Sequence, residues 1–338
     1  MNNDGIVSVD FIKPASSSLS TFNVNCNKIT YIGGLESCDR LYNFEAESNN
    51  ISDISPLAGD PLHSLHRLDL TNNNISDISP LAGASDLSYL KLSFNSIVDV
   101  SPLEQCESLK ELELSNNKLE DISGINNCYK PYKLDLSYNN ISDISALKDH
   151  LVLDDLNLKH NKIKDISSLA TCENYINESH YCILSYNEIS DISGLENYQG
   201  NYIFLDHNKI SDISTLSSFT NTIYLYLDHN EITDSSPLEK LNKAQIISMN
   251  FNKLTNVSNL LLLPEIKNIL VASNDIADVS GIIEKDKIIR HSNDKTNLMI
   301  SWKEGIPHKF KLALWLVLQY IDTLLTINKP LECPLRAC

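Results

Sequence analysis

The nine residues from Asn73 to Leu81 read NNISDISPL, and the same nine letters stand at Asn49–Leu57. Directly before the later copy, Leu68 and Leu70 flank a polar residue, and inside the quoted stretch apolar residues recur every three positions. A period of two predicts a short strand with one buried face, whereas a period of three predicts a tight turn of helix or 3₁₀. The stretch therefore predicts a strand, a turn at Asn73 and a short helical segment.

The Asn at the turn recurs along most of the chain. Of the eleven steps between its twelve copies, eight are 22 residues long and the others are 24, 26 and 21; the copies are Asn27, Asn49, Asn73, Asn95, Asn117, Asn139, Asn161, Asn187, Asn208, Asn230, Asn252 and Asn274. A fixed period of this length is typical of a solenoid, in which each repeat stacks on its neighbours. At roughly 4.8 Å for each step of a parallel sheet, the strands predict a sheet about 50 Å long.

The repeated Asn has a physical purpose at the end of each strand. Backbone groups in the turn point inward and have no partner in a strand ladder. A buried Asn amide can donate and accept hydrogen bonds at once, so it can satisfy these groups and those of the next repeat. The sequence therefore predicts a ladder of buried Asn side chains, with Asn139 in the most regular copy.

These residues resemble the leucine-rich repeat, over about residues 20–283. The 22-residue length and the phrase at Asn49–Leu57 and Asn73–Leu81 are similar to the subclass shared by bacterial internalins and the regulatory subunit of type 1 protein phosphatase. The resemblance implies an α/β solenoid with a parallel concave β-sheet and a short helical or 3₁₀ convex side. The matching residues are structural ones, so it implies function only weakly.

Three segments are expected. Residues 1–19 lead into the solenoid, residues 20–283 form about twelve repeats, and residues 284–338 form a C-terminal cap segment with a cap helix near 309–327. An open solenoid end exposes core and needs a cover. The alternative for residues 310–327 is a membrane-associated segment, but only ten uncharged residues separate Lys311 from Asp322, too few to span a bilayer.

The chain is acidic. Its net charge is −17, and residues 283–338 hold nine Lys/Arg and six Asp/Glu, so the rest carries −17 − (9 − 6) = −20. This balance argues against nucleic acid or an anionic membrane as a partner. A protein partner that is basic or neutral, with an apolar patch, is expected.

The expected compartment is the cytoplasm, with a secreted or cell-surface location as the alternative. The first 14 residues have acidic side chains, no basic start and no long apolar run, unlike a secretory signal. Four cysteines occupy one column of the repeat, eleven residues after the Asn, where other repeats carry mostly apolar residues: Cys38, Cys106, Cys128 and Cys172. Cysteines in this column are expected to pack as small reduced hydrophobes.

Side chains between the buried strand positions point to the concave face, and they form two zones. The acidic zone, in repeats two to seven, holds Glu45, Glu47, Asp69, Glu111, Glu113, Asp135 and Asp155. The aromatic zone, in repeats eight to eleven, holds Tyr181, Ile183, Tyr186, Tyr202, Phe204, His207, Tyr224, Tyr226, His229 and Phe251. Neighbouring strands lie about 5 Å apart, so each zone is one patch, and exposed aromatic patches mark binding sites. The alternative is that strands simply favour Tyr and Phe.

The sequence predicts neither an enzyme nor a cofactor or metal site. An Asp column four residues after the Asn, such as Asp77 and Asp143, resembles a stack of ligands, but Asp before a tight turn is more often a cap for backbone N–H groups. No phosphate loop, zinc-spaced Cys/His set or nucleophile motif is present. The expected function is a protein-interaction scaffold and candidate phosphatase regulatory subunit; the alternative is an internalin-like secreted adhesin or effector.

Overall fold

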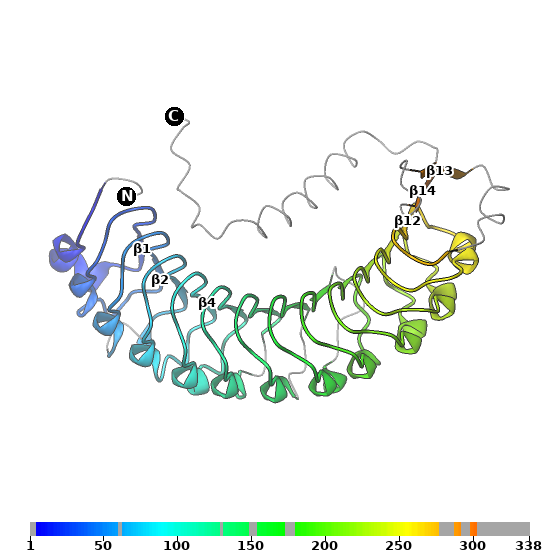
Figure 1. The fold of residues 1–338 in the computed structure, drawn as a ribbon. Coiled ribbons are helices and arrows are strands. Elements are labelled where there is room, and N and C mark those ends of the chain that lie inside the picture. The colour runs from blue at the N-terminus through cyan, green and yellow to red at the C-terminus, as the bar shows by residue number, and fades with distance from the viewer. Residues whose placement is uncertain are drawn as a thin grey trace.

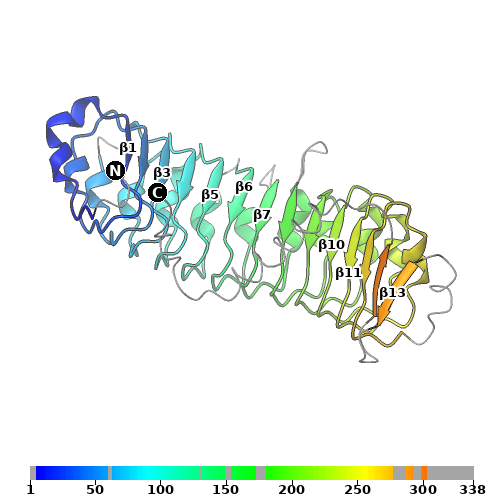
Figure 2. The same ribbon diagram turned by 90° about the horizontal axis from the view of Figure 1, so that it is seen from above.

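The computed structural model describes residues 5–59, 63–128, 131–148, 154–172, 180–276, 287–291 and 298–302. These residues form a curved solenoid, with strands on the inner side of the arc and 3₁₀ segments on the outer side (Figure 1). Seen from above, the strands lie side by side as one long sheet (Figure 2). The predicted solenoid with a parallel concave sheet is confirmed.

Each of the twelve repeats contributes one three-residue strand. The strands are β1 (Thr21–Asn23), β2 (Asn43–Glu45), β3 (Arg67–Asp69), β4 (Tyr89–Lys91), β5 (Glu111–Glu113), β6 (Lys133–Asp135), β7 (Asp155–Asn157), β8 (Tyr181–Ile183), β9 (Tyr202–Phe204), β10 (Tyr224–Tyr226), β11 (Ile246–Ser248) and β12 (Asn268–Leu270). Consecutive strands pair in parallel, and equivalent residues face one another, as Leu134 and Leu156 do. The constant register brings each repeat position beside its equivalent in the next repeat.

The outer side consists of short 3₁₀ segments. They are η1 (Asp10–Ser18), η2 (Gly33–Leu35), η3 (Ser55–Leu57), η5 (Ser79–Leu81), η6 (Ser101–Gln105), η7 (Ser123–Ile125), η8 (Ser145–Leu147), η9 (Ser167–Thr171), η10 (Ser193–Leu195), η11 (Ser214–Ser218), η12 (Ser236–Lys240) and η13 (Ser258–Leu262). In most of them the backbone N–H of the first Ser donates to the Asp two residues earlier, as Ser145 does to Asp143 at 2.8 Å. The Asp column therefore caps turns, as predicted.

The core is a continuous apolar line between the sheet and the 3₁₀ segments. The middle residue of each strand and the apolar residues of each turn are almost fully buried. Burying one Leu or Ile side chain contributes about 1.5–3 kcal/mol, so the repeated pattern supplies the main stabilisation. Cys38, Cys106, Cys128 and Cys172 are also buried, and burial raises the pKa of Cys128 to about 12, so it remains a neutral packing thiol.

The Asn ladder joins each repeat to the one before it. The Asn139 amide nitrogen donates to the carbonyls of Leu114, Leu136 and Ser137 at 3.0, 3.0 and 3.2 Å, and its oxygen accepts from the Leu119 N–H at 3.0 Å. Leu114 and Leu119 belong to the preceding repeat, so one side chain satisfies groups of two repeats. The predicted ladder is confirmed.

The N-terminal end of the solenoid is covered by residues of the first segment. Val9 and Ile12 are buried in the core, and η1 packs beside η2. Ser8 also forms a parallel bridge with Tyr31. The first repeat therefore does not expose its apolar interior to water.

At the other end, β14 (Leu298–Trp302) pairs antiparallel with β12, and β13 (Lys287–His291) pairs antiparallel with β14. The sequence pattern did not predict these two strands, which fall inside the expected cap segment. The expected cap helix near 309–327 lies outside the described residues and stays a prediction. Within the ranges described above, no helix has the length and apolar character needed to cross a membrane.

Replacing Asn139 with Ala should lower the free energy of unfolding by about 1–3 kcal/mol, because buried backbone groups of two repeats lose their partner. Chemical denaturation monitored by circular dichroism measures this change. Asn140→Ala is the matched control, since the neighbouring side chain is only half-buried and lies outside the ladder. Equal stability of the two variants would contradict the ladder's role.

Candidate protein-binding face

The first and third residues of each three-residue strand point to the concave face. In β9 and β10 the middle residue is buried, while the two flanking side chains are partly exposed on the concave side. Because the strands are in register, Tyr202 faces Tyr224 and Phe204 faces Tyr226. The structure therefore brings the strand members of the aromatic zone together on three consecutive strands, β8 to β10.

The rings of this part of the aromatic zone contact one another across the strands. Tyr181 stacks on Tyr202 with ring centroids 4.6 Å apart, and Phe204 stacks on Tyr226 at 5.0 Å. Tyr202 meets Tyr224 edge to face at 5.2 Å. Burial raises the pKa of Tyr226 to about 12, so its hydroxyl stays neutral and can act as a donor. The result is an apolar surface that carries phenolic hydroxyl groups.

The remaining members of the aromatic zone belong to a different row, just before each ladder Asn. We call this row the ring column: Tyr138, His160, Tyr186, His207, His229 and Phe251. Successive rings stack with centroids 4.4, 4.1, 3.9, 4.1 and 4.1 Å apart and planes within 11–25° of parallel. Since the inner rings are covered on both faces within the stack, they offer only their edges to a partner.

The ring column depends on an unusual backbone conformation. Every residue directly before a ladder Asn has a positive φ, between 53° and 58°. Non-glycine residues seldom adopt this left-handed region, which costs about 1–2 kcal/mol per residue. The sequence reasoning missed this feature, although Asn72 and Asn116 in the column were a signal, because Asn tolerates the left-handed region well.

Burial in the ring column changes the acid–base behaviour of its members. His160 lies between Tyr138 and Tyr186, and burial, together with the nearby Lys159, lowers its pKa to about 4. Burial and then His207 also lower the pKa of His229. These two histidines are therefore neutral members of an aromatic stack at physiological pH.

The acidic zone contains an ion-pair network that the sequence reasoning did not identify. Lys91 lies 3.3 and 3.2 Å from carboxylate oxygens of Glu111 and Glu113. Lys133 lies 2.9 Å from Glu111 and also pairs with Glu113. The two glutamates are thus neutralised by lysines of the neighbouring strands, so the middle of this zone is less acidic than its carboxylates alone suggested.

The network shifts the pKa values of its members. Burial opposes ionisation of Glu111, but the hydrogen bonds with Lys133 and Glu113 and the charges of the two lysines together outweigh it, and the pKa of Glu111 falls to about 2. In the other direction, burial raises the pKa of Glu47, Asp69, Asp135 and Asp155. For Glu47 the carboxylate of Asp69 adds to the effect. Outside the network, the acidic zone therefore holds carboxylates that a cationic partner would stabilise.

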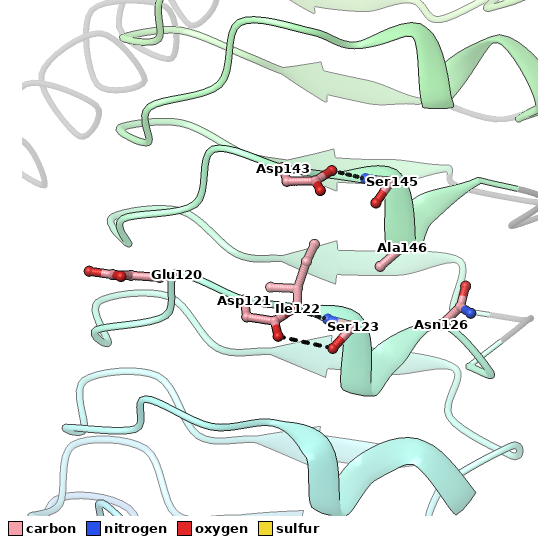
Figure 3. Close-up of a pocket in the computed structure, with 8 residues that line it drawn as sticks. All are labelled: Glu120, Asp121, Ile122, Ser123, Asn126, Asp143, Ser145 and Ala146. Carbon is pink, nitrogen blue, oxygen red and sulfur yellow. Dashed lines mark hydrogen bonds between the residues drawn. The ribbon is translucent and has the colours of Figure 1, made fainter.

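One hollow lies on the outer side of the solenoid, between η7 and η8. Figure 3 shows its lining: Glu120, Asp121, Ile122, Ser123, Asn126, Asp143, Ser145 and Ala146. The carboxylates of Asp121 and Asp143 already accept the N–H groups of Ser123 and Ser145, at 2.7 and 2.8 Å. No group of three or more His, Cys, Asp or Glu among the described residues could hold a metal ion. The hollow is thus a by-product of capped turns.

A second hollow lies at the N-terminal end of the concave face. Its lining is Thr21, Tyr42, Asn43, His66, Arg67 and Tyr89. The Arg67 guanidinium lies over the Tyr89 ring, 4.3 Å from its centroid, and Tyr42 stacks on His66 at 4.8 Å. On this face, therefore, an Arg side chain can pack against a Tyr of the neighbouring strand.

Comparisons with known proteins agree with this geometry. A family model described as Leucine Rich repeats (2 copies) matches residues 43–83 and 85–127, and one described as Leucine Rich repeat matches residues 133–148. A comparison with curated proteins finds no match. The matched residues coincide with strands, ladder Asn residues and capped turns.

Solved structures with a similar fold include an internalin from Listeria monocytogenes, 27% identical, with a TM-score of 0.66 over 80% of this chain and 86% of that one. A leucine-rich repeat protein from Leptospira interrogans is 19% identical, with a TM-score of 0.62 over 82% and 78%. The plant peptide hormone receptor RGFR1, in complex with RGF2, is 20% identical, with a TM-score of 0.64 over 74% and 43%. The last two likenesses concern the fold alone.

The ring column predicts a stability change with pH. The pKa of His160 is lowered from 6.5 to about 4 on folding, so its contribution is complete above pH 6.5 and is lost as the pH falls towards 4. His160→Phe keeps a ring in the stack without an ionisable nitrogen. Thermal unfolding between pH 7.5 and 4 should therefore show a shallower loss of stability for His160→Phe than for the wild type, whereas His63→Phe, at an exposed site, should follow the wild type.

The ion-pair network predicts a stability effect of Lys133. Lys133→Met should lower the free energy of unfolding by about 1–3 kcal/mol, because Glu111 and Glu113 then lose a charged donor. Denaturant titration at neutral pH measures the loss. Lys118→Met, at an exposed position, is the control and should be nearly neutral. A Lys133→Met variant as stable as the control would show that the network contributes nothing.

Proposed function

We propose that this chain, a leucine-rich repeat protein, binds a protein partner on the concave face of β1–β12. The observation that carries the proposal is the continuous set of ring side chains on β8 to β10. Tyr181, Tyr202 and Tyr224 form one row across these strands, and Phe204 and Tyr226 form a second. The proposal assigns the chain no catalytic role.

Physical properties of the face support a protein ligand. Rings on a sheet face offer large contact areas at a small entropic cost, and Tyr is among the preferred anchors of protein interfaces. Tyr181 is 39% exposed, and the other strand rings are half-buried, so they are held in place before binding. The net charge of −17 favours a basic or neutral partner over nucleic acid or an anionic membrane.

A finer proposal is that the partner is the catalytic subunit of a protein phosphatase, in the cytoplasm. It is supported by the combination of acidic and aromatic side chains on the concave face, which is similar to that of phosphatase regulatory subunits of this repeat class. The cysteines in the described part of the chain are thiols outside any disulfide, which fits a reducing compartment: Cys26, Cys38, Cys106, Cys128, Cys172 and Cys182.

A second candidate is an internalin-like secreted adhesin or effector. The likeness to the Listeria internalin favours it, since it extends over 80% of this chain at 27% identity. The two candidates share the concave binding face and differ in compartment. Fractionation of the cells that make the protein separates them, because an adhesin or effector is found outside the producing cell.

The quadruple variant Tyr202→Ala, Phe204→Ala, Tyr224→Ala, Tyr226→Ala should reduce partner recovery about tenfold or more, because clustered interface anchors each contribute on the order of 1–2 kcal/mol. Affinity capture with wild type and variant, followed by quantitative mass spectrometry, measures this loss. Binding of purified type 1 phosphatase catalytic subunit is measured in parallel and tests the finer proposal.

The matched control for capture is Val98→Ala with Leu262→Ala, which removes exposed apolar side chains away from the concave strands; their exposed fractions are 57% and 70%. The control should recover partners as the wild type does. Equal recovery by the quadruple variant, with its fold retained by circular dichroism, would rule out the concave aromatic site. Failure to bind the phosphatase subunit alone would rule out only the finer proposal.

A further inference from the structure

Repeats nine and ten carry almost the same strand and turn. Residues 202–207 read YIFLDH and residues 224–229 read YLYLDH. In register, they place three like pairs side by side on the concave surface: Phe204 with Tyr226, Asp206 with Asp228, and His207 with His229. Asp206 and Asp228 come two residues after Phe204 and Tyr226, just past the ends of β9 and β10, and the charges of both carboxylates act on Tyr226. The two carboxylates therefore lie between a stacked ring pair and the ring column.

Both carboxylates are held in fixed positions. Asp206 accepts a hydrogen bond from the Ser185 hydroxyl and lies 3.0 Å from the His207 Nδ1. Asp228 accepts from the Ser248 hydroxyl at 2.7 Å and from the Asn250 N–H at 2.6 Å. The Asp206 side chain is 18% exposed, so it remains within reach of a partner. These contacts orient the carboxylates, and none of the four comes from a Lys or Arg side chain.

Repeats eight to eleven supply no cation of their own to this part of the face, although Lys159 of the preceding repeat has its Nζ 5.2 Å from the centroid of the Tyr186 ring. The strands β8–β11 and the residues that lead to each ladder Asn, which are 181–186, 202–207, 224–229 and 246–251, contain no Lys or Arg. Nearby lysines are engaged elsewhere, since Lys209 pairs with Glu188 and Lys253 with Glu231, each at 2.8 Å. In the acidic zone, by contrast, Lys91 and Lys133 neutralise the glutamates of β5.

Burial, and next to it the neighbouring Asp206, raises the pKa of Asp228. A cation placed between the two carboxylates would relieve this repulsion. The rings beside them add a second attraction, because the face of an aromatic ring favours a cation. Arg suits both demands, as its planar guanidinium stacks on rings and forks to carboxylates. Arg67 over Tyr89 is an example of such packing on the same face.

We propose that the Asp206–Asp228 pair, with Phe204 and Tyr226 beside it, is a subsite for an arginine side chain of a protein partner. This inference rests on the proposed function and names the chemistry of one contact within it. The guanidinium donates to both carboxylates and packs against the ring pair. The subsite therefore selects partners that present an arginine side chain within an extended or loop segment.

The test uses a dye-labelled peptide of alternating Gly and Arg, with lysine and citrulline versions of the same sequence. Citrulline keeps the shape of Arg but is neutral. Fluorescence anisotropy at low ionic strength should give wild-type affinity about tenfold higher for the arginine peptide than for the citrulline peptide, with the lysine peptide between them. Equal affinity for the arginine and citrulline peptides would overturn the subsite.

Asp206→Asn with Asp228→Asn keeps one acceptor oxygen at each position for the Ser185 and Ser248 hydroxyls and should remove most of that preference. Glu104→Gln with Glu107→Gln makes the same change in net charge at exposed positions away from the face, and should leave affinity within about twofold. If the control loses as much as the Asp variant, long-range attraction explains the binding and the subsite is wrong. Phe204→Leu with Tyr226→Leu is a second variant, which removes the rings and should also weaken the arginine preference.

Partner capture separates this inference from the proposed function. A partner lost by the quadruple alanine variant but retained at full affinity by Asp206→Asn with Asp228→Asn would support the concave site and overturn the arginine subsite. A partner whose binding is lost in both variants would support both the concave binding site and the arginine subsite. In a third outcome, the Asp pair distinguishes the arginine peptide from the citrulline peptide, but the quadruple alanine variant recovers partners as well as the wild type does. This outcome would support the subsite and overturn the proposed function.

Discussion

The Asn ladder determines the spacing of everything else in this protein. Each ladder side chain bonds backbone groups of its own turn and of the preceding repeat, as Asn139 does with Leu136 and Leu114. Because the amide has a fixed reach, neighbouring repeats stay in register even where the intervening loop is longer by two or four residues. The same bonds hold the residue before each Asn at a φ near +55°, a conformation that its side chain alone would not favour.

One consequence is that residues at the same position of successive repeats are neighbours in space. A side chain on the concave face meets its equivalents in the repeats before and after it, so the identity of three successive residues decides whether the contact attracts or repels. Glu111 and Lys133 are such neighbours and attract. Asp206 and Asp228 are such neighbours and repel, which makes that position the more favourable one for an external cation. Small sequence differences between repeats therefore give neighbouring parts of the concave face different charge and chemistry.

The fold was predictable because its determinants are periodic. The spacing of Asn139 and its equivalents, the buried Leu positions and the Asp caps each recur, and a recurring pattern is visible without neighbours in space. The acidic and aromatic zones were predictable as sets for the same reason, although their role in binding stays a prediction. Backbone conformation and pairing were harder: the positive φ of Tyr186 and the bonds of Lys133 depend on three-dimensional geometry. The strands β13 and β14 have no repeat pattern to predict them.

The two aromatic rows differ in what they can offer a partner. In the ring column, each inner ring such as Tyr186 is covered on both faces by neighbours 4.1 and 3.9 Å away, so the row stiffens the edge of the sheet and exposes ring edges. On the strands, ring contacts are wider and partly edge to face, as between Tyr202 and Tyr224, so faces and hydroxyl groups remain accessible. We therefore expect specific recognition to involve the strand rows and the Asp206–Asp228 pair, which lies between the Phe204/Tyr226 row and the ring column. The ring column would then keep these groups in a fixed geometry before a partner arrives.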